Sequence, residues 1–272
     1  MNTRATQIPF MKMHGLGNDF VVVDERGRAP MVDAALAVAM ADRHRGVGFD
    51  QLAVMRGSEA ADVRLVFYNA DGSFSAACGN ATRCIARYVM GETGQDSVRL
   101  QTDHGILAAR DAGGGLTAVN MGHARTDWHA IPLAQECDTL HLPIDGTPTA
   151  TSMGNPHCSF FVTDAEAVEL AVQGPQIEHH PLFPQRTNVQ FVHVAGKDTL
   201  RMRVWERGAG ITLASGSSSC AVAHAAWRRG LVGRDVTLRL DGGEIGIRIA
   251  EDGIWMTGPT AHVFDGVWRV AS

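Results

Sequence analysis

The chain has 272 residues, 45% of them hydrophobic and 19% charged, with a formal net charge of −5. This composition is that of a globular protein and excludes a mostly disordered chain. No basic stretch stands out and no apolar run approaches the ~18 residues that span a bilayer, so neither nucleic acid nor a membrane is expected as a partner.

Short apolar stretches separated by Gly, Asp and Pro predict strands at residues 20–23, 63–67, 159–162, 200–204 and 237–240. Helical patterns lie among them, at residues 31–43, 79–90, 164–173 and 216–229. The last of these helices is small and apolar on nearly all sides, as in a buried helix. The mixture of elements indicates an α+β fold.

The two halves of the chain repeat each other. Residues that correspond at an offset of 137 are Gly17 with Gly154, Gln51 with Asn188, Tyr68 with Trp205, and Cys78 with Ser215. Gly105 corresponds to Gly243 at 138, a slip of one residue. We therefore predict two pseudo-symmetric domains, each a curved mixed β-sheet or barrel wrapped around a central helix.

The predicted division places residues 1–122 plus 263–272 in an N-terminal lobe and residues 123–262 in a C-terminal lobe. The C-terminal strand near 263–272 is expected to return to the first lobe. A symmetric pair of lobes forms a natural cleft, where ligand pockets commonly lie. A ligand held there would be approached from two sides by equivalent elements.

Each half has a Gly-containing loop where a helix should begin, Cys78-Gly79-Asn80 in the first and Ser215-Gly216-Ser217 in the second. Free N–H groups at a helix start bind anions, and the helix dipole adds to this, so two such starts suit a carboxylate. The same field lowers the pKa of Cys78 from its usual ~8.5 and makes its thiol a base or nucleophile. The remaining cysteines are expected to be small packed residues: Cys84, Cys137, Cys158 and Cys220.

The sequence favours chemistry without a cofactor. Only two lysines occur, Lys12 and Lys197, and a pyridoxal enzyme needs a lysine to hold its cofactor. No cluster of His or Cys has the spacing of metal ligands, so no metal is expected. The first residues lack the apolar segment of a secretion signal, which predicts a cytoplasmic location.

Several motifs run in order along nearly the whole chain, at residues 12–20, 46–51, 68–73, 77–84, 154–157, 186–189 and 205–210. Together they resemble the diaminopimelate epimerase family of pyridoxal-independent amino-acid epimerases. The resemblance implies conversion of LL- to meso-diaminopimelate by two-base proton transfer at the α-carbon, in lysine and peptidoglycan precursor biosynthesis. It also implies a homodimer.

This reaction requires stabilisation of a carbanion through its carboxylate, with a base on one face of the α-carbon and an acid on the other. By resemblance, Cys78 is one catalytic thiol, and the second thiol of the family falls on Ser215. A serine hydroxyl is far less acidic than a thiol, but it can donate a proton, or accept one with help from a neighbouring group. Cys220 cannot replace it, because five helical residues place it ~7 Å along the axis.

Four interpretations of Ser215 stay open: a natural Cys/Ser pair, an engineered Cys→Ser change that traps a ligand, a slow or silent homologue, or a different amino-acid substrate. The following residues, Ser217-Ser218-Ser219, also depart from the Thr-Gly pattern usual in the family. This favours natural drift over a single engineered change.

The resemblance assigns roles to further residues. His157 and Glu206 adjust the proton affinities of the catalytic pair, and their repeat counterparts, Phe20 and Asn69, are not ionisable. The α-carboxylate lies on the backbone of Gly79-Asn80 and Gly216-Ser217. The rest of the substrate is bound by Asn18, Gln51, Asn69, Asn155, Asn188, Glu206 and Arg207.

Two alternative functions stay open. One is an epimerase or racemase of another amino acid, such as histidine or a hydroxyproline. The other is a catalytically idle amino-acid-binding protein, which Ser215 motivates. Arg207 and the asparagines favour a substrate with a second polar end, because a guanidinium clamps a carboxylate with two hydrogen bonds.

Overall fold

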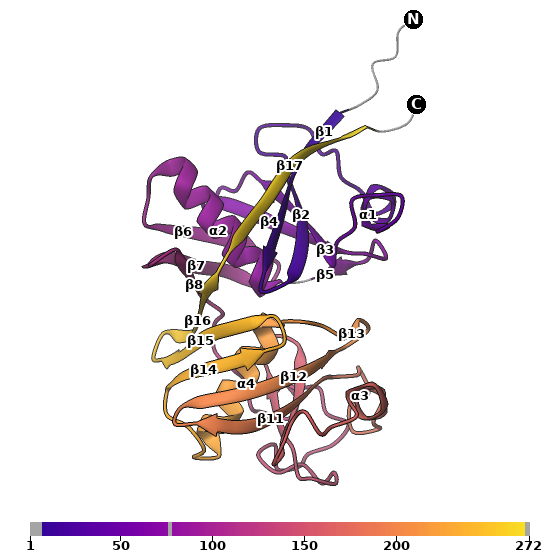
Figure 1. The fold of residues 1–272 in the computed structure, drawn as a ribbon, viewed down its shortest axis with the longest axis vertical. Helices are drawn as coiled ribbons and strands as arrows, with labels where there is room; N and C mark the ends of the chain where they lie inside the picture. The colour runs from indigo at the N-terminus through magenta and orange to yellow at the C-terminus, as the bar shows by residue number, and fades with distance from the viewer. Residues whose placement is uncertain (1–6, 76–77, 270–272) are drawn as a thin grey trace, which may run out of the picture. The chain divides into compact units, whose positions relative to one another are not determined.

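The computed structural model describes residues 7–75 and 78–269, which form two compact units (Figure 1). The first unit contains the described residues up to Val119 and the segment from Pro259 onward, and the second runs from Asn120 to Gly258. Both units combine a mixed sheet with helices, which confirms the predicted α+β class. The predicted lobe boundaries, after residues 122 and 262, stay a prediction.

The first unit is built on one mixed sheet with a helix on each face. Its elements are β1 (Gln7–Gly15), β2 (Asn18–Asp24), α1 (Ala34–Ala41), β3 (Gln51–Arg56), β4 (Val63–Asn69), β5 (Phe74–Ser75), α2 (Gly79–Thr93), β6 (Ser97–Thr102), β7 (Gly105–Gly113), β8 (Leu116–Asn120) and β17 (Ala261–Arg269). The strands pair in the order β17-β1-β2-β3-β4-β6-β7-β8, with β5 also beside β4. The β2–β3 and β4–β6 pairs are parallel, and the others are antiparallel.

The second unit repeats this plan. Its elements are β9 (Thr149–Ser152), β10 (Pro156–Phe161), α3 (Leu170–Glu178), β11 (Asn188–Gly196), β12 (Thr199–Glu206), β13 (Gly210–Ile211), α4 (Gly216–Arg228), β14 (Asp235–Leu240), β15 (Gly243–Ala250) and β16 (Gly253–Pro259). The order is β9-β10-β11-β12-β14-β15-β16, with β13 beside β12. The parallel pairs, β10–β11 and β12–β14, stand where β2–β3 and β4–β6 stand in the first unit.

The strand registers confirm the internal repeat residue by residue. Phe20 lies opposite Gln51 in the first unit, and His157 lies opposite Asn188 in the second. Phe20 corresponds to His157, and Gln51 to Asn188, at the offset of 137 that the sequence shows. After the central helices in the chain, the hairpins β6–β7 and β14–β15, which turn at Gly105 and Gly243, correspond at an offset of 138.

The central helices α2 and α4 are enclosed by their own sheets. Helix α2 packs against β1, β2, β6 and β7, and α4 packs against β9, β10, β11, β14 and β15. Small residues let α4 be buried along nearly its whole length, from Gly216 to Ala226. The predicted buried helix at 216–229 is therefore confirmed.

The parallel pairs β2–β3 and β10–β11 are buried on both faces. The central helix of each unit covers one face, and α1 or α3 covers the other. In the first unit, Val21 and Leu52 belong to the core beneath α1. Side chains alternate along a strand, so Phe20, Val22 and Ala53 face the other way, toward the interior that holds α2. In the second unit, the core against α3 contains the repeat counterparts Cys158 and Val189.

One predicted helix is misplaced. The pattern indicated a helix at residues 164–173, but α3 covers Leu170–Glu178. The carbonyl groups of Ala165 and Val168 accept hydrogen bonds from the Arg203 guanidinium, at 3.3 and 3.0 Å. The segment before residue 170 therefore forms turns anchored to β12.

The C-terminal strand returns to the first unit, as predicted for the part of 263–272 that the structure describes. Strand β17, yellow in Figure 1, pairs antiparallel with β1 from Ala261 to Arg269. Among the described residues, no helix has the length and apolar character needed to cross a bilayer.

Two glycines give a matched test of this packing. A Cβ atom added to Gly174 in α3 would lie 2.6 Å from the Trp205 ring, whereas one added to Gly91 in α2 meets nothing within 4 Å. We predict that Gly174→Ala lowers the free energy of unfolding by about 1–3 kcal/mol. The control Gly91→Ala should raise it by up to ~1 kcal/mol, because alanine favours helix. Denaturant titration measures both values; equal effects of the two substitutions would contradict the packing described.

Candidate active site

The sheet topology gathers the candidate residues at one end of each unit. In the first unit, parallel strands β2 and β3 begin at Asn18 and Gln51, and the antiparallel strand β4 ends at Asn69. Helix α2 then begins beside them at Gly79. In the second unit, β11, β12 and α4 bring Asn188, Glu206 and Gly216 to the equivalent end.

Cys78 is the N-cap residue of α2, with extended backbone at φ −143° and ψ 102°. Its sulfur accepts a hydrogen bond from the backbone N–H of Ala81 at 3.4 Å, and its carbonyl accepts one from the N–H of Thr82. The residue is 8% exposed. A sulfur that caps a helix meets the positive end of the helix dipole, which stabilises negative charge on it.

A directional chain of hydrogen bonds links the start of α2 to the start of β2. The Arg83 guanidinium donates to Asn80 Oδ1 at 3.0 Å, and Asn80 Nδ2 donates to Asn18 Oδ1 at 3.2 Å. Asn18 Nδ2 in turn donates to a carboxylate oxygen of Asp50 at 2.7 Å. Because the chain runs from a cation to an anion, the orientation of both amides is fixed.

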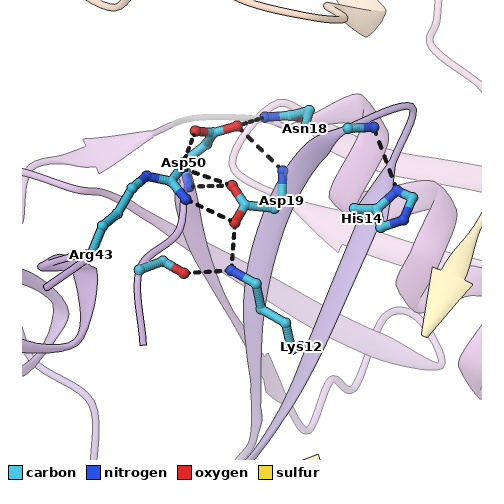
Figure 2. A network of polar contacts seen from close by, with 8 residues as sticks. Lys12, His14, Asn18, Asp19, Arg43 and Asp50 are labelled. Carbon is cyan, nitrogen blue, oxygen red and sulfur yellow. Dashed lines mark hydrogen bonds and ion pairs between the residues drawn. The ribbon is translucent and has the colours of Figure 1, made fainter. Parts of the chain in front are cut away.

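Asp50 belongs to an ionic network that holds this end of the sheet together (Figure 2). The Arg43 guanidinium contacts Asp50 at 2.8 Å and Asp19 at 2.9 Å. The Lys12 ammonium donates to Asp19 and to the Gly48 carbonyl. The network joins β1 and β2 to the loop before β3, and so positions Asn18.

Gln51 and Asn69 form a second pair on neighbouring strands. Gln51 Nε2 donates to Asn69 Oδ1 at 3.0 Å, and Asn69 Nδ2 donates to the Ser73 hydroxyl at 3.0 Å. Both amides are partly buried. Their polar atoms lie at the strand ends where the sequence predicted a substrate-binding set.

In the second unit, His157 lies on β10 with no exposed surface. Its Nε2 faces Asn155 Oδ1 at 2.9 Å, and its Nδ1 faces the Gln190 amide nitrogen at 3.1 Å. Burial lowers the pKa of His157 to about 3, and the positive charge of Arg207 acts in the same direction. The imidazole is therefore neutral near neutral pH.

The loop that carries Glu206 and Arg207 is fixed by two buried side chains. Asn188 Oδ1 accepts from the Arg207 backbone N–H at 3.0 Å, while Asn188 Nδ2 donates to the Pro156 carbonyl at 2.9 Å. The Glu178 carboxylate accepts from the Trp205 indole at 2.6 Å and from the Gly208 N–H at 2.9 Å. The Arg207 side chain is exposed, with one hydrogen bond to the Gln185 carbonyl.

Ser215 is the N-cap of α4, and so stands where Cys78 stands in the first repeat. It is 3% exposed, and its hydroxyl makes no capping bond to the described backbone of α4. Gly216 and Ser217 follow as the first residues of that helix. The Glu206 carboxylate, at the end of β12, accepts from the Thr212 hydroxyl at 2.6 Å.

The other cysteines have the environment of packed thiols. Burial raises the pKa of Cys84 to about 11, and burial also raises the pKa of Cys158 and of Cys137. Cys220 has no exposed surface on α4. Within the described part of the chain, no group of three or more His, Cys, Asp or Glu side chains is arranged to hold a metal ion.

Three residues with a direct structural role were not identified from the sequence. Asp50 orients Asn18, Gln190 contacts His157, and Glu178 holds the Arg207 loop. Gln190 and Asp50 each had a signal. Gln190 is a polar residue in an apolar strand, and its counterpart in the first repeat is Ala53. Asp50 directly precedes Gln51 in the motif at residues 46–51.

Comparison with known sequences gives one consistent result. The family model described as diaminopimelate epimerase matches residues 10–126 and 149–263. The diaminopimelate epimerase of Rhodospirillum centenum is 51% identical over 264 residues, covering 94% of this chain and 91% of that protein. The diaminopimelate epimerase of Acidiphilium cryptum is 46% identical, with 95% of each chain covered.

Solved structures with the same fold are more distant in sequence. A hydroxyproline epimerase from Agrobacterium vitis has a TM-score of 0.67 at 14% identity, covering 100% of this chain and 94% of that one. A probable proline racemase from Agrobacterium radiobacter has a TM-score of 0.69 at 14% identity, covering 97% and 93%. These two matches establish the epimerase fold.

The ionic network predicts a pH-dependent contribution to stability. Burial raises the pKa of Asp19, but hydrogen bonds from Arg43 and Lys12 outweigh it and leave that pKa below 3.8. A lowered folded-state pKa stabilises the protein above the unfolded value of ~3.9, and this stability is lost as pH falls through the folded value. We therefore predict that Asp19→Asn is destabilised at pH 7 and that its deficit shrinks in acid.

The measurement is the free energy of unfolding of both proteins across the acid range. Asp96→Asn, which changes an exposed aspartate before β6, is the control and should match the wild type throughout. A deficit of Asp19→Asn that stays constant as pH falls would show that the ion pairs do not contribute to stability.

Proposed function

The chain belongs to the diaminopimelate epimerase family, and on that basis we propose that it interconverts LL- and meso-diaminopimelate without a cofactor. The observation that supports this most directly is the pair of repeat-related helix starts at which Cys78 and Ser215 occupy the N-cap position. The reaction belongs to lysine and peptidoglycan precursor biosynthesis.

The chemistry sets what the site must supply. An α-proton beside an ammonium and a carboxylate is very weakly acidic, so its removal needs strong stabilisation of charge on the carboxylate. The backbone N–H groups at Gly79-Asn80 and at Gly216-Ser217 are proposed to bind that carboxylate. Their position in the first turns of α2 and α4 supports this, because helix starts present unpaired N–H donors.

Cys78 and Ser215 are the proposed proton-transfer groups, because inversion requires a proton to leave one face of the carbon and arrive at the other. The N–H of Ala81 and the dipole of α2 stabilise a Cys78 thiolate, which can act as the base. Ser215 is proposed to act as a neutral hydroxyl, with Glu206 adjusting its proton affinity. His157 is proposed to adjust the proton affinity of the Cys78 thiol in the same way.

The amides and Arg207 are proposed to bind the distal end of the substrate. Asn18 begins β2, and Asn155 directly precedes β10, the equivalent strand; Gln51 and Asn188 begin the next strands of the two units. The planar Arg207 guanidinium is exposed and suits a carboxylate, which it can bind with two hydrogen bonds. The unlike charges of the two repeats suit a substrate with unlike ends.

The test is incorporation of deuterium at the α-carbon of LL-diaminopimelate in heavy water, with purified protein and no added cofactor. We expect exchange together with inversion to the meso form. Exchange without inversion would assign activity to Cys78 alone. Tight binding with neither exchange nor inversion would replace the proposal by an amino-acid-binding function.

Ser215 is tested in the same assay. Ser215→Cys should raise turnover about 10-fold or more, because a thiol is several pKa units more acidic than a hydroxyl and is a better proton carrier. Cys220→Ser, which changes a buried thiol of the same helix, is the control and should not raise it. An unchanged or lower rate in Ser215→Cys would contradict the proton-transfer role of this position.

We also propose a homodimer and a cytoplasmic location. Strand β17 exposes the apolar side chains Val263, Phe264 and Val267, by 52%, 46% and 53%. Exposed apolar side chains on a long strand suit association with a second copy. Val267→Asp should shift the sedimentation coefficient toward a monomer, whereas Val172→Asp, at a valine of α3 that is 54% exposed, should not. A monomeric wild-type protein would refute the dimer.

A further inference from the structure

The two repeats differ most in one layer of their interiors. In the second unit, four polar residues line the space between the sheet and the start of α4: His157, Ser159, Gln190 and Ser218. At the offset of 137, their counterparts in the first unit are Phe20, Val22, Ala53 and Ala81. All eight residues have no exposed surface.

This comparison shows that the fold itself does not require the polar layer. The same strands, in the same register, close over the same helix with hydrocarbon side chains in the first unit. Burial of polar groups stabilises a fold less than burial of hydrocarbon, even when each group is hydrogen-bonded. A role other than folding is therefore the better explanation for the polar layer.

The hydrogen bonds within the polar layer determine which atoms donate and which accept. The Ser159 hydroxyl donates to Gln190 Oε1 at 3.0 Å, which orients the amide. Gln190 Nε2 then faces both the Ser218 hydroxyl and His157 Nδ1, each at 3.1 Å. An amide nitrogen only donates hydrogen bonds, so Nδ1 of a neutral imidazole must accept and the ring proton must lie on Nε2.

We propose that Gln190, oriented by Ser159 and Ser218, is a positioning residue that holds His157 as the neutral Nε2–H tautomer. The catalytic meaning of this step rests on the proposed function. The Nε2–H points at Asn155 Oδ1, 2.9 Å away, on the side of the candidate substrate residues. His157 can thus donate a hydrogen bond at the site without adding a second positive charge beside Arg207.

Charge around the ring supports the neutral form. The positive charge of Arg207, which follows β12, acts on His157. The partners of the ring are neutral: the amides of Asn155, before β10, and Gln190, on β11, and the hydroxyl of Ser218, on α4. A carboxylate in place of the Gln190 amide would reverse the arrangement. It could only accept, so it would bind a proton on Nδ1 and stabilise the imidazolium.

The test is ¹⁵N NMR of the full-length protein with labelled histidine, in which protonated and unprotonated ring nitrogens have distinct shifts. His157→Asn identifies the signals of His157. We expect an unprotonated Nδ1 and a protonated Nε2 that do not titrate between about pH 5 and 8. Gln190→Glu should move a proton onto Nδ1, and Thr117→Val, which changes a buried threonine of the first unit, should leave the tautomer unchanged.

Activity gives an independent readout. Gln190→Glu should lower kcat for epimerisation by about 10-fold or more with a smaller change in KM, because it alters a proton donor near the reacting groups. If this variant does not fold, Gln190→Ala installs the residue of the first repeat and should yield a mixture of tautomers. A wild-type Nδ1–H, or a single Nε2–H in either folded Gln190 variant, would overturn the proposal.

The two proposals can fail separately. If the wild-type protein has the expected tautomer but exchanges no α-proton, the proposed function fails and the role of Gln190 toward His157 stands. If epimerisation proceeds but Nδ1 carries the proton, the positioning role alone is refuted.

Discussion

The parallel strand pair in the centre of each repeat determines which candidate site residues lie at the same end of the sheet. Because β2 and β3 run the same way, Asn18 and Gln51 both begin strands at one end of the sheet, and β4 returns to that end at Asn69. The chain must then enter the buried helix from the same place, which puts Cys78 there. A sheet that was antiparallel throughout would scatter these residues between two ends.

The two repeats use this common frame for different electrostatics. The first repeat surrounds its helix start with full charges, in a chain from Arg83 through two asparagines to Asp50. The second has neutral dipoles around His157, and its charges near the site lie in the loop that holds Glu206 and Arg207 and in the buried Glu178 carboxylate that anchors this loop. A frame that is symmetric in backbone and asymmetric in charge fits the proposed epimerisation, in which one group removes a proton from the α-carbon and another returns it.

Much of this arrangement could be predicted from the sequence, because a repeat constrains register as well as fold. The offset of 137 between Gln51 and Asn188 already implied that both would begin equivalent strands, as they do. The exact partners of buried polar groups could not be read in the same way. Hydrogen bonds such as Gln190 to His157 join residues 33 apart, and they depend on side-chain orientation that periodicity does not encode. The position of α3 was wrong for a related reason, since the segment before it forms turns whose carbonyls accept hydrogen bonds from Arg203, a residue of a later strand.

The buried ion pair of Lys12 also has a practical consequence. Of the two lysines, Lys12 is engaged with Asp19 and the Gly48 carbonyl, while Lys197 is exposed in the turn between β11 and β12. That turn lies at the end of β11 opposite Asn188. Of the two lysine side chains, amine-reactive coupling would therefore favour Lys197, which places a dye or a resin at the end of β11 away from Asn188.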